Sequence, residues 1–323
     1  MEYRSVDDLN HVLRERLYLV PRDVDLIVGI PRSGLLAANL LALHLNLPLA
    51  DLDGYLEGRV LYTGRTRRGI VERRVADQPR KVLILDDSSR TGAEIRAARE
   101  RVAAAAMPGE HLYAAVYACT ETLGEVDIHF ELCDPPRVFE WNVMHHGFLK
   151  RSCLDIDGVL CADPTDEEND DGPCYSRFLE QATPRFLPTA PVGWLVTSRL
   201  EKYRAATEAW LARHGVNYGE LLMMDYPDMA ARRAAGQYCR FKADAYIRTR
   251  AMLFIESSHL LAEGISRLAG KPVLCIETGK IVNPNLVDRA KHRSRDLLFR
   301  IRCRVRMFVG RFQRVGEQTP PSG

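Results

Sequence analysis

The sequence lacks long apolar runs, paired-cysteine motifs and internal repeats. No stretch approaches the roughly 20 consecutive apolar residues that a membrane-spanning helix needs. The opening segment MEYRSVDDLN contains acidic residues and no apolar block, which argues against a signal peptide. The eight cysteines are scattered and none forms a CxxC pair, so neither a zinc cage nor a disulfide framework is predicted. Reduced thiols and a cytoplasmic location are therefore expected.

The length and the strand pattern predict two α/β domains. A chain of 323 residues exceeds what one hydrophobic core usually spans. Buried strands alternate with amphipathic or apolar helices, which is typical of two doubly wound parallel sheets. Consecutive prolines within residues 133–141 mark a border, after which the pattern restarts. The expected domains are residues 1–141, residues 142–285 and a basic C-terminal segment, residues 286–323. Strands are expected at 25–30, 81–87, 112–119, 152–160, 192–198, 251–258 and 271–278, and helices at 34–45, 92–106 and 199–216.

The segment LILDDSSRTGAEI, residues 83–95, combines a strand end with a helix start. An apolar strand runs into Asp86 and Asp87, and a short Ser/Thr/Gly loop then opens a helix. A loop at a helix N-terminus offers unpaired backbone N–H groups to a phosphate. The adjacent carboxylates can accept hydrogen bonds from the vicinal hydroxyls of a sugar. Together these groups predict a pocket for a ribose 5-phosphate.

This segment resembles the phosphoribosyl pyrophosphate (PRPP) motif of type I phosphoribosyltransferases. The segment IVGIPRSG, residues 27–34, resembles the pyrophosphate loop of the same family. The resemblance covers about residues 5–141 and implies transfer of phosphoribosyl from PRPP to a nitrogenous base, with Mg²⁺ neutralising the pyrophosphate. It implies PRPP binding by Arg32, Ser33, Gly34, Asp86, Asp87, Ser88, Ser89, Arg90, Thr91 and Gly92.

Two features of this half leave alternatives open. The Arg-rich segment 59–74 stands where the family has a mobile loop, so Arg65, Arg67 and Arg68 would form a lid over pyrophosphate; a solvated hairpin explains the segment equally well. Arg90 stands where several purine-specific members have an acid, and Glu94 where many have a hydroxyl. These departures leave the base unidentified, and they keep open a regulatory protein that binds PRPP or a nucleotide without turnover.

The segment CLDIDGVLC, residues 153–161, places two acids at another strand end. One carboxylate, Asp155, can attack a phosphorus atom while its neighbour, Asp157, handles a proton. The segment resembles the DxDGx(L/V) motif of the haloacid dehalogenase (HAD) superfamily of phosphatases. The resemblance implies an aspartyl-phosphate on Asp155 and acid–base work by Asp157. It further implies a phosphoryl contact from Thr197 or Ser198, charge compensation by Lys242, and Mg²⁺ held by Asp155, Asp157 and Glu256.

The C-terminal segment is strongly basic. Residues 287–323 contain ten Lys or Arg against three acids, while the whole chain carries a net charge of +2. Apolar residues recur at helical spacing between Leu297 and Phe312, flanked by arginines. Such a stripe packs on the body of the protein or on a second subunit of a homodimer. A membrane surface or a nucleic acid is the alternative partner.

The two motifs together predict a bifunctional enzyme. The first domain would make a nucleotide from PRPP and a base, and the second would remove the phosphate of that nucleotide or of a related phosphate ester. Phosphatase activity alone remains a third reading. The sequence identifies neither the base nor the ester.

Overall fold

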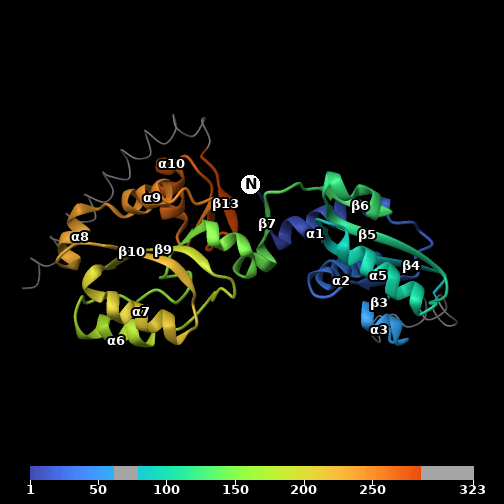
Figure 1. Ribbon diagram of the computed structural model, residues 1–323, viewed down its shortest axis with the longest axis horizontal. Helices are drawn as coiled ribbons and strands as arrows, with labels where there is room; N and C mark the ends of the chain where they lie inside the picture. Colours follow the sequence, from blue (N-terminus) through green and yellow to red (C-terminus); the bar gives the residue numbers. More distant parts are fainter. Residues whose placement is uncertain (62–78, 285–323) are drawn as a thin grey trace, which may run out of the picture. The chain divides into compact units, whose positions relative to one another are not determined.

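The computed structural model describes residues 1–61 and 79–284, and contacts divide the chain into two compact units (Figure 1). The first unit is Met1–Val143 and the second begins at Met144. The predicted lid arginines and the basic segment from residue 286 lie outside the described residues. Each unit is an α/β layer on a mainly parallel sheet, as the strand–helix alternation predicts.

The first unit places its main sheet between helices. The strand order is β3-β2-β4-β5-β6 and all neighbours are parallel; β1 and β7 form a separate parallel pair. Its elements are β1 (Glu2–Arg4), α1 (Val6–Glu15), η1 (Leu17–Leu19), β2 (Leu26–Gly29), α2 (Ser33–Leu45), β3 (Leu49–Asp51), α3 (Leu52–Leu56), β4 (Lys81–Ser89), α5 (Ala93–Ala104), β5 (Glu110–Ala118), η3 (Thr120–Glu125), β6 (Ile128–Leu132) and β7 (Arg137–Phe139).

This strand order fixes where a ligand site belongs. From β2, the chain builds first toward β3 on one side and then toward β4 on the other. The order reverses between β2 and β4, and open α/β sheets bind ligands outside the carboxyl ends of the strands at such a reversal. Both segments that resemble the phosphoribosyltransferase motifs follow these two strands.

Alternation along the strands fills a core on each face of the first sheet. Leu83 and Leu85 of β4 pack with α1 and α2, whereas Val82 and Ile84 pack with α3 and α5. Side-chain hydrogen bonds cap the N-terminus of α1. Ser5 Oγ accepts a hydrogen bond from the Asp8 amide while the Asp8 carboxylate accepts one from the Ser5 amide, a reciprocal capping box.

The second unit has the strand order β10-β9-β8-β11-β12-β13. Figure 1 shows α9 and α10 on one side of this sheet and α6 and α7 on the other. The elements are η4 (Glu140–His145) at the junction, η5 (Gly147–Arg151), β8 (Ser152–Leu154), α6 (Pro173–Gln181), β9 (Val192–Leu200), η6 (Glu201–Tyr203), α7 (Arg204–Arg213), β10 (Tyr218–Met224), α8 (Met229–Ala235), α9 (Tyr238–Arg248), β11 (Leu253–Glu256), α10 (His259–Ala269), β12 (Val273–Cys275) and β13 (Lys280–Val282).

The second sheet also has a reversal point, which lies between β8 and β11. Asp155 follows β8 and Glu256 ends β11, so the sheet sets these two acids side by side. The Asp155 amide donates to the Ile255 carbonyl at 3.0 Å, which fastens the two strand ends together. One strand departs from the expected parallel sheet: β13 pairs antiparallel with β12 at the edge.

Element boundaries differ from the sequence prediction in three places. Strand β8 ends at Leu154 and not at residue 160, before the loop that turns at Gly158. In the two other places a strand continues further than expected. Strand β4 continues through both acids to Ser89, because Ser88 and Ser89 pair with Tyr117 and Ala118 of β5. The helix expected over residues 199–216 begins later. Strand β9 runs to Leu200 and η6 intervenes before α7. In both places pairing with a neighbouring strand extends the strand past its polar residues.

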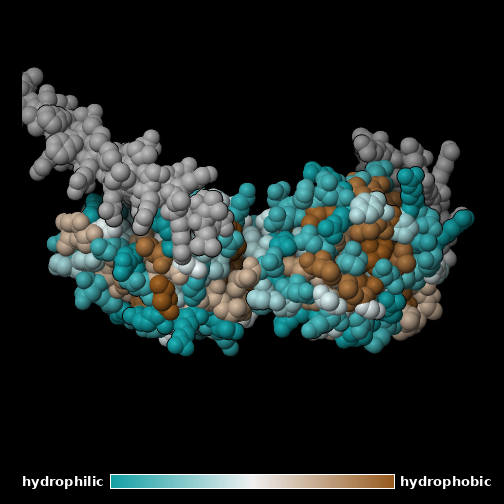
Figure 2. Space-filling model, turned by 90° about the horizontal axis from the view of Figure 1, so that it is seen from above, coloured by the Kyte–Doolittle hydropathy of each residue, from teal (hydrophilic) through white to brown (hydrophobic). Residues whose placement is uncertain are grey.

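Among the described residues, no helix is long and apolar enough to span a bilayer. Large exposed hydrophobic side chains occur on both units, for example Leu43 of α2 and Leu260 of α10. Figure 2 shows the apolar colour interrupting an otherwise polar surface.

Candidate functional site

The loop between β2 and α2 lies directly against the acidic end of β4. The Ile30 amide donates to the Leu85 carbonyl at 3.0 Å. A Cβ atom at Gly34 would come within 2.8 Å of Asp86 Oδ1 and 2.9 Å of the Leu85 carbonyl oxygen. Glycine is thus required for the loop to reach the acid. The structure brings the two predicted PRPP segments into contact, with Arg32 exposed and Ser33 half-buried at the start of α2.

Asp86 and Asp87 are both buried near the end of β4, and their carboxyl groups lie close enough to interact with each other. Their exposed fractions are 7% and 4%. Asp86 Oδ1 accepts the Asp87 amide at 2.9 Å. Burial, followed by the neighbouring charge of Asp87, raises the pKa of Asp86 well above its usual value.

Trp141 forms a hydrogen bond with Asp87. Its indole Nε1 donates to Asp87 Oδ2 at 2.9 Å. The ring stacks on Phe139 with centroids 4.9 Å apart and an angle of 11° between the planes, and Phe139 in turn stacks on Tyr117. An aromatic column from β5 and β7 therefore fixes the indole that contacts the carboxylate.

The helix that follows β4 starts without a side-chain cap. Gly92 is the N-cap of α5 with φ +72°, and a Cβ atom there would also collide with Glu125 Cγ at 2.6 Å. Thr91 Oγ1 accepts the Ala93 amide at 3.4 Å, so the other first-turn amides remain available for an anion. Arg90 and Thr91 are exposed, Ser88 is half-buried, and Ser89 is buried.

In the second unit, Lys242 joins the two acids at the reversal point. Its Nζ lies 2.5 Å from Asp155 Oδ2 and 2.7 Å from Glu256 Oε2. All three side chains are buried, with exposed fractions of 5%, 1% and 0% for Asp155, Lys242 and Glu256. The sequence prediction placed Lys242 beside Asp155, and the structure does the same.

The pKa shifts follow from this arrangement. Burial lowers the pKa of Lys242, but the two carboxylates outweigh it and raise the pKa, so the ammonium is charged. Burial and the charge of Glu256 raise the pKa of Asp155. Two carboxylates share one cation, and one of the three groups therefore carries an uncompensated negative charge unless a proton or a ligand is bound.

Asp157 is separated from this cluster by its own ion pair. Arg199 Nη2 lies 2.6 Å from Asp157 Oδ1, and Arg199 Nε lies 3.1 Å from Oδ2. Burial lowers the pKa of Arg199, and Asp157 more than offsets this and raises it. Arg199 is only 1% exposed. Both oxygens of the Asp157 carboxylate are engaged by this arginine, at the position where the resemblance implies a proton carrier.

The predicted magnesium ligands Asp155, Asp157 and Glu256 do not form one metal-binding group. Across residues 1–61 and 79–284, no cluster of three or more His, Cys, Asp or Glu side chains is arranged to hold a metal ion. The physical reason is that Lys242 lies between Asp155 and Glu256 while Arg199 binds Asp157. In this arrangement Lys242 and Arg199 engage the carboxylate oxygens that would bind Mg²⁺, so this metal set stays a prediction.

The two hydroxyls considered for phosphoryl contact face opposite sides of β9. Thr197 Oγ1 accepts the Arg199 amide at 3.2 Å and is buried. Ser198 follows Val196 on the face that packs against α9, the helix that carries Lys242. Ser198 Oγ is buried without a hydrogen-bond partner among the described residues. Ser198 is therefore the hydroxyl on the side of Asp155 and Lys242.

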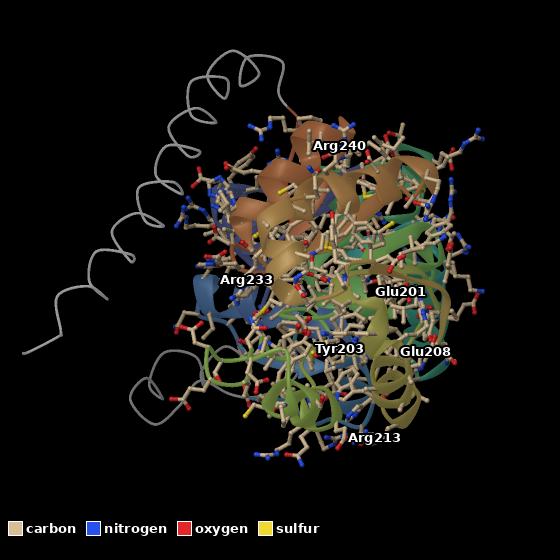
Figure 3. All side chains as sticks on the ribbon, turned by 90° about the vertical axis from the view of Figure 1, so that its left-hand side faces the viewer. Glu201, Tyr203, Glu208, Arg213, Arg233 and Arg240 are labelled. Carbon is tan, nitrogen blue, oxygen red and sulfur yellow. The ribbon has the colours of Figure 1, made fainter. Side chains whose placement is uncertain are left out.

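The insert between Cys161 and α6 is anchored near this site. The Asp171 carboxylate accepts from Lys202 Nζ, the Tyr203 hydroxyl and the Met229 amide, each at 2.9 Å. Figure 3 labels Tyr203 within the second unit. One carboxylate thereby ties the insert to η6 and to the start of α8.

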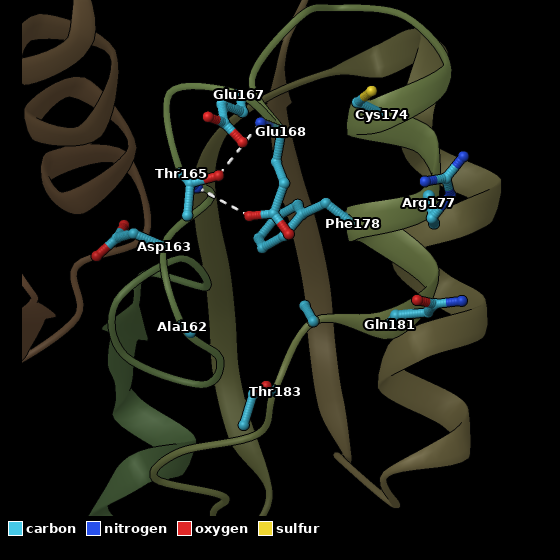
Figure 4. A pocket seen from close by; sticks show the side chains of 11 residues that line it. Ala162, Asp163, Thr165, Glu167, Glu168, Cys174, Arg177, Phe178, Gln181 and Thr183 are labelled. Carbon is cyan, nitrogen blue, oxygen red and sulfur yellow. Dashed lines mark hydrogen bonds between the residues drawn. The ribbon is translucent and has the colours of Figure 1, made fainter.

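A pocket of about 470 Å³ lies between the insert and α6 (Figure 4). Thr165 and Glu168 form reciprocal backbone–side-chain hydrogen bonds at its rim, at 2.9 and 3.2 Å. Asp163 lines the pocket, and a Cβ atom at Gly158 would come within 2.7 Å of Asp163 Oδ2. Burial and then Asp157 raise the pKa of Asp163. The pocket therefore borders the loop that follows Asp155.

Sequence reasoning missed Arg199, the partner of Asp157. Arg199 directly follows the predicted strand 192–198, and a charged residue next to strand-end hydroxyls is a usable signal.

No family model matches this chain, and no curated protein matches it. Solved structures do show similarity. A xanthine-guanine-hypoxanthine phosphoribosyltransferase from Helicobacter pylori aligns over 44% of this chain and 92% of its own, with 12% identity and a TM-score of 0.32. A purine phosphoribosyltransferase from Pyrococcus horikoshii aligns over 44% and 95%, with 22% identity and a TM-score of 0.30. At these TM-scores the likeness carries no conclusion about function.

Proposed function

We propose that this chain is a bifunctional enzyme, with a phosphoribosyltransferase of type I in the first unit and a HAD-type phosphatase in the second. One observation carries the proposal. In each sheet, buried carboxylates lie near the carboxyl end of at least one strand that flanks the reversal point, where α/β folds bind their ligands. The sequence motifs supply the same residues independently.

In the first unit, the contacts suit a ribose 5-phosphate that carries pyrophosphate. Asp86 and Asp87 would accept hydrogen bonds from the ribose hydroxyls, and the uncapped start of α5 would hold the 5-phosphate. The Arg32–Gly34 loop, which touches Asp86, would face the pyrophosphate. The bond between C1 and the pyrophosphate oxygen breaks, and a base nitrogen bonds to C1. Bound Mg²⁺ would neutralise the leaving pyrophosphate.

In the second unit, Asp155 would attack phosphorus to give an aspartyl-phosphate, and water would then hydrolyse it to inorganic phosphate. Lys242 keeps the carboxylate oriented and offsets its charge. Asp157 serves as the proton carrier for the leaving alcohol only when it separates from Arg199, since both of its oxygens are otherwise engaged. The same separation would have to occur before the second, hydrolytic step.

A second candidate for the first unit is PRPP or nucleotide binding without turnover. The observation that favours it is the hydrogen bond from Trp141 to Asp87, which occupies an acid that the transferase needs for ribose. The charge of Glu94 beside Asp86 points the same way. Such a unit would bind its ligand and regulate the phosphatase.

The transferase half is tested with the full chain, PRPP, Mg²⁺ and a panel of bases, following pyrophosphate release. We expect release with at least one base. The Asp86→Asn variant should lose most of this activity, while Asp53→Asn, at an exposed acid of the same unit, should retain it. Tight PRPP binding without pyrophosphate release would establish the binding candidate, and no binding would leave only the phosphatase.

The phosphatase half is tested by phosphate release from nucleoside monophosphates and from p-nitrophenyl phosphate. Asp155→Asn should abolish hydrolysis because the amide cannot attack phosphorus. The matched control is Asp244→Asn, an exposed acid on the helix that carries Lys242. Unchanged phosphate release from Asp155→Asn would reject Asp155 as the nucleophile.

A further inference from the structure

We propose that Arg232 of α8 and Ser198 of β9 form an oxyanion-binding pair that holds the phosphoryl group presented to Asp155. This rests on the proposed phosphatase function of the second unit. It adds a cation from α8 that no sequence motif supplies.

The Arg232 side chain contacts the backbone of Ser198, and each residue has a side-chain atom with unused hydrogen-bonding capacity. Arg232 Nη1 donates to the Ser198 carbonyl oxygen at 2.6 Å. Arg232 Nε and Ser198 Oγ are buried atoms, and neither has a hydrogen-bond partner in the described part of the chain. The guanidinium group also lies over the Tyr238 ring, 5.7 Å from its centroid, which limits its movement.

Arg232 Nε and Ser198 Oγ are unsatisfied polar atoms on two residues in contact, which indicates a ligand. Buried polar groups in folded proteins are nearly always hydrogen-bonded, because leaving one unpaired destabilises the protein. Arg232 Nε–H can only donate, and the Ser198 hydroxyl can donate as well. The group that satisfies both is therefore an acceptor, and the guanidinium charge selects a negatively charged one.

The location of the pair agrees with a phosphoryl ligand. The register Leu154↔Leu195 places Asp155 beside Val196, and Ser198 lies two residues further along the same face. Lys242 approaches this face from α9, and Arg232 comes from α8 immediately before it. Burial and Asp157 raise the pKa of Tyr175, whereas Arg199 and Arg232 oppose the rise. The charge of Arg232 thus reaches the region of Asp157.

The charge count around the strand ends favours a third cation for a phosphate dianion. Asp155, Asp157 and Glu256 bring three carboxylates, and Lys242 and Arg199 bring two cations. At the edge, the charge of Asp163 is opposed by that of Arg185. These groups leave one net negative charge, which Arg232 offsets, so the repulsion of an anion is reduced.

The test uses the full chain and inorganic phosphate as a competitive inhibitor of p-nitrophenyl phosphate hydrolysis. Arg232→Gln should raise the inhibition constant of phosphate at least about tenfold, since a charged hydrogen bond is lost. Arg232→Lys should give a smaller rise, because lysine keeps the charge and lacks the Nε donor. Arg233→Gln is the matched control: Arg233 is the neighbouring, exposed arginine, labelled in Figure 3, and its removal should change the constant less than about twofold.

Two results overturn the inference. One is an unchanged inhibition constant in Arg232→Gln together with a lower melting temperature, which would make Arg232 a purely structural residue. The other is an equal effect from Arg233→Gln, which would reduce the role to general surface charge. If the unmodified chain hydrolyses no ester, the phosphatase proposal fails by itself. Calorimetric titration with inorganic phosphate then decides whether Arg232→Gln loses a binding component that Arg233→Gln keeps.

Discussion

The carboxylates at the strand ends have different kinds of partner in the two units. In the first, Asp86 and Asp87 accept hydrogen bonds from neutral donors, the Asp87 amide and the Trp141 indole. In the second, the acids at the strand ends pair with cations: Lys242 contacts Asp155 and Glu256, and Arg199 contacts Asp157. The same position in two α/β sheets therefore carries different electrostatics.

The difference indicates how each site responds to its ligand. The pKa of Asp86 is raised because this acid is buried beside a second one. A sugar that donates hydroxyl hydrogens, the ligand proposed above, would complete that site. In the second site Lys242 and Arg199 hold three carboxylates in place and leave one net negative charge, so the proposed phosphate ligand needs an additional cation.

Removing the cation of the second site should have the largest effect. Lys242→Met leaves Asp155 and Glu256 buried beside each other, and we expect the second unit to lose about 3–5 kcal/mol of unfolding free energy. Denaturant unfolding followed by the emission of Trp194 and Trp210 measures this, while Trp141 reports the first unit. Lys150→Met, at an exposed lysine of the same unit, is the control. A loss under about 1 kcal/mol would contradict the charge balance described here.

Replacing one glycine in each of the two site loops by alanine should have an intermediate effect on the unfolding free energy. The two losses compare how tightly the loops are packed. Gly158 has φ +75° and a Cβ atom there would lie 2.4 Å from Ser257 Cβ, so Gly158→Ala should cost about 2–4 kcal/mol. At Gly34, whose φ is not in the left-handed region, a Cβ atom would lie 2.8 Å from Asp86 Oδ1 and 2.9 Å from the Leu85 carbonyl oxygen, so Gly34→Ala should cost about 1–2 kcal/mol. Gly124→Ala, where no heavy atom lies within 4 Å, serves as reference. Equal losses at the two loops would show that the second loop is no tighter than the first.

The smallest effect concerns pH and the first unit alone. Because the pKa of folded Asp86 is raised, the folded unit keeps a proton that the unfolded chain releases above its ordinary pKa of 3.8. Stability should therefore fall as pH rises from that value, by at most about 1.4 kcal/mol per pH unit, and level off above the folded pKa. Asp86→Asn should flatten the fall in unfolding curves read from Trp141. A variant whose curve still fell with the original slope would show that another group is responsible.

Much of each sheet was predictable because its strands are apolar runs that end at polar residues. β2, β4, β5, β9 and β11 were expected within a few residues of their observed bounds. The strand ends were harder to predict. β4 and β9 continue as far as a neighbouring strand offers hydrogen bonds, and residue propensities carry no information about that neighbour. Short elements such as β3 gave too few residues for a periodicity.

The sites were predictable as residue types and less so as contacts. The motifs identified Asp155, Lys242 and Glu256, which the fold brings together. They gave no indication that Arg199 would bind Asp157 or that Trp141 would bind Asp87. Each of those partners comes from another part of the sequence, at a spacing that varies with the loops between them, so only the folded chain reveals the pair.

The carboxylate of Asp171 has a consequence for how this protein can change over generations. It secures the far end of the insert to two elements that belong to the sheet's own framework, η6 and α8. Residues between Ala162 and Asp170 can then be lengthened, shortened or replaced while both attachment points stay where they are. Under the proposed phosphatase function, substitutions in this stretch could change which ester is accepted, at little cost in folding free energy.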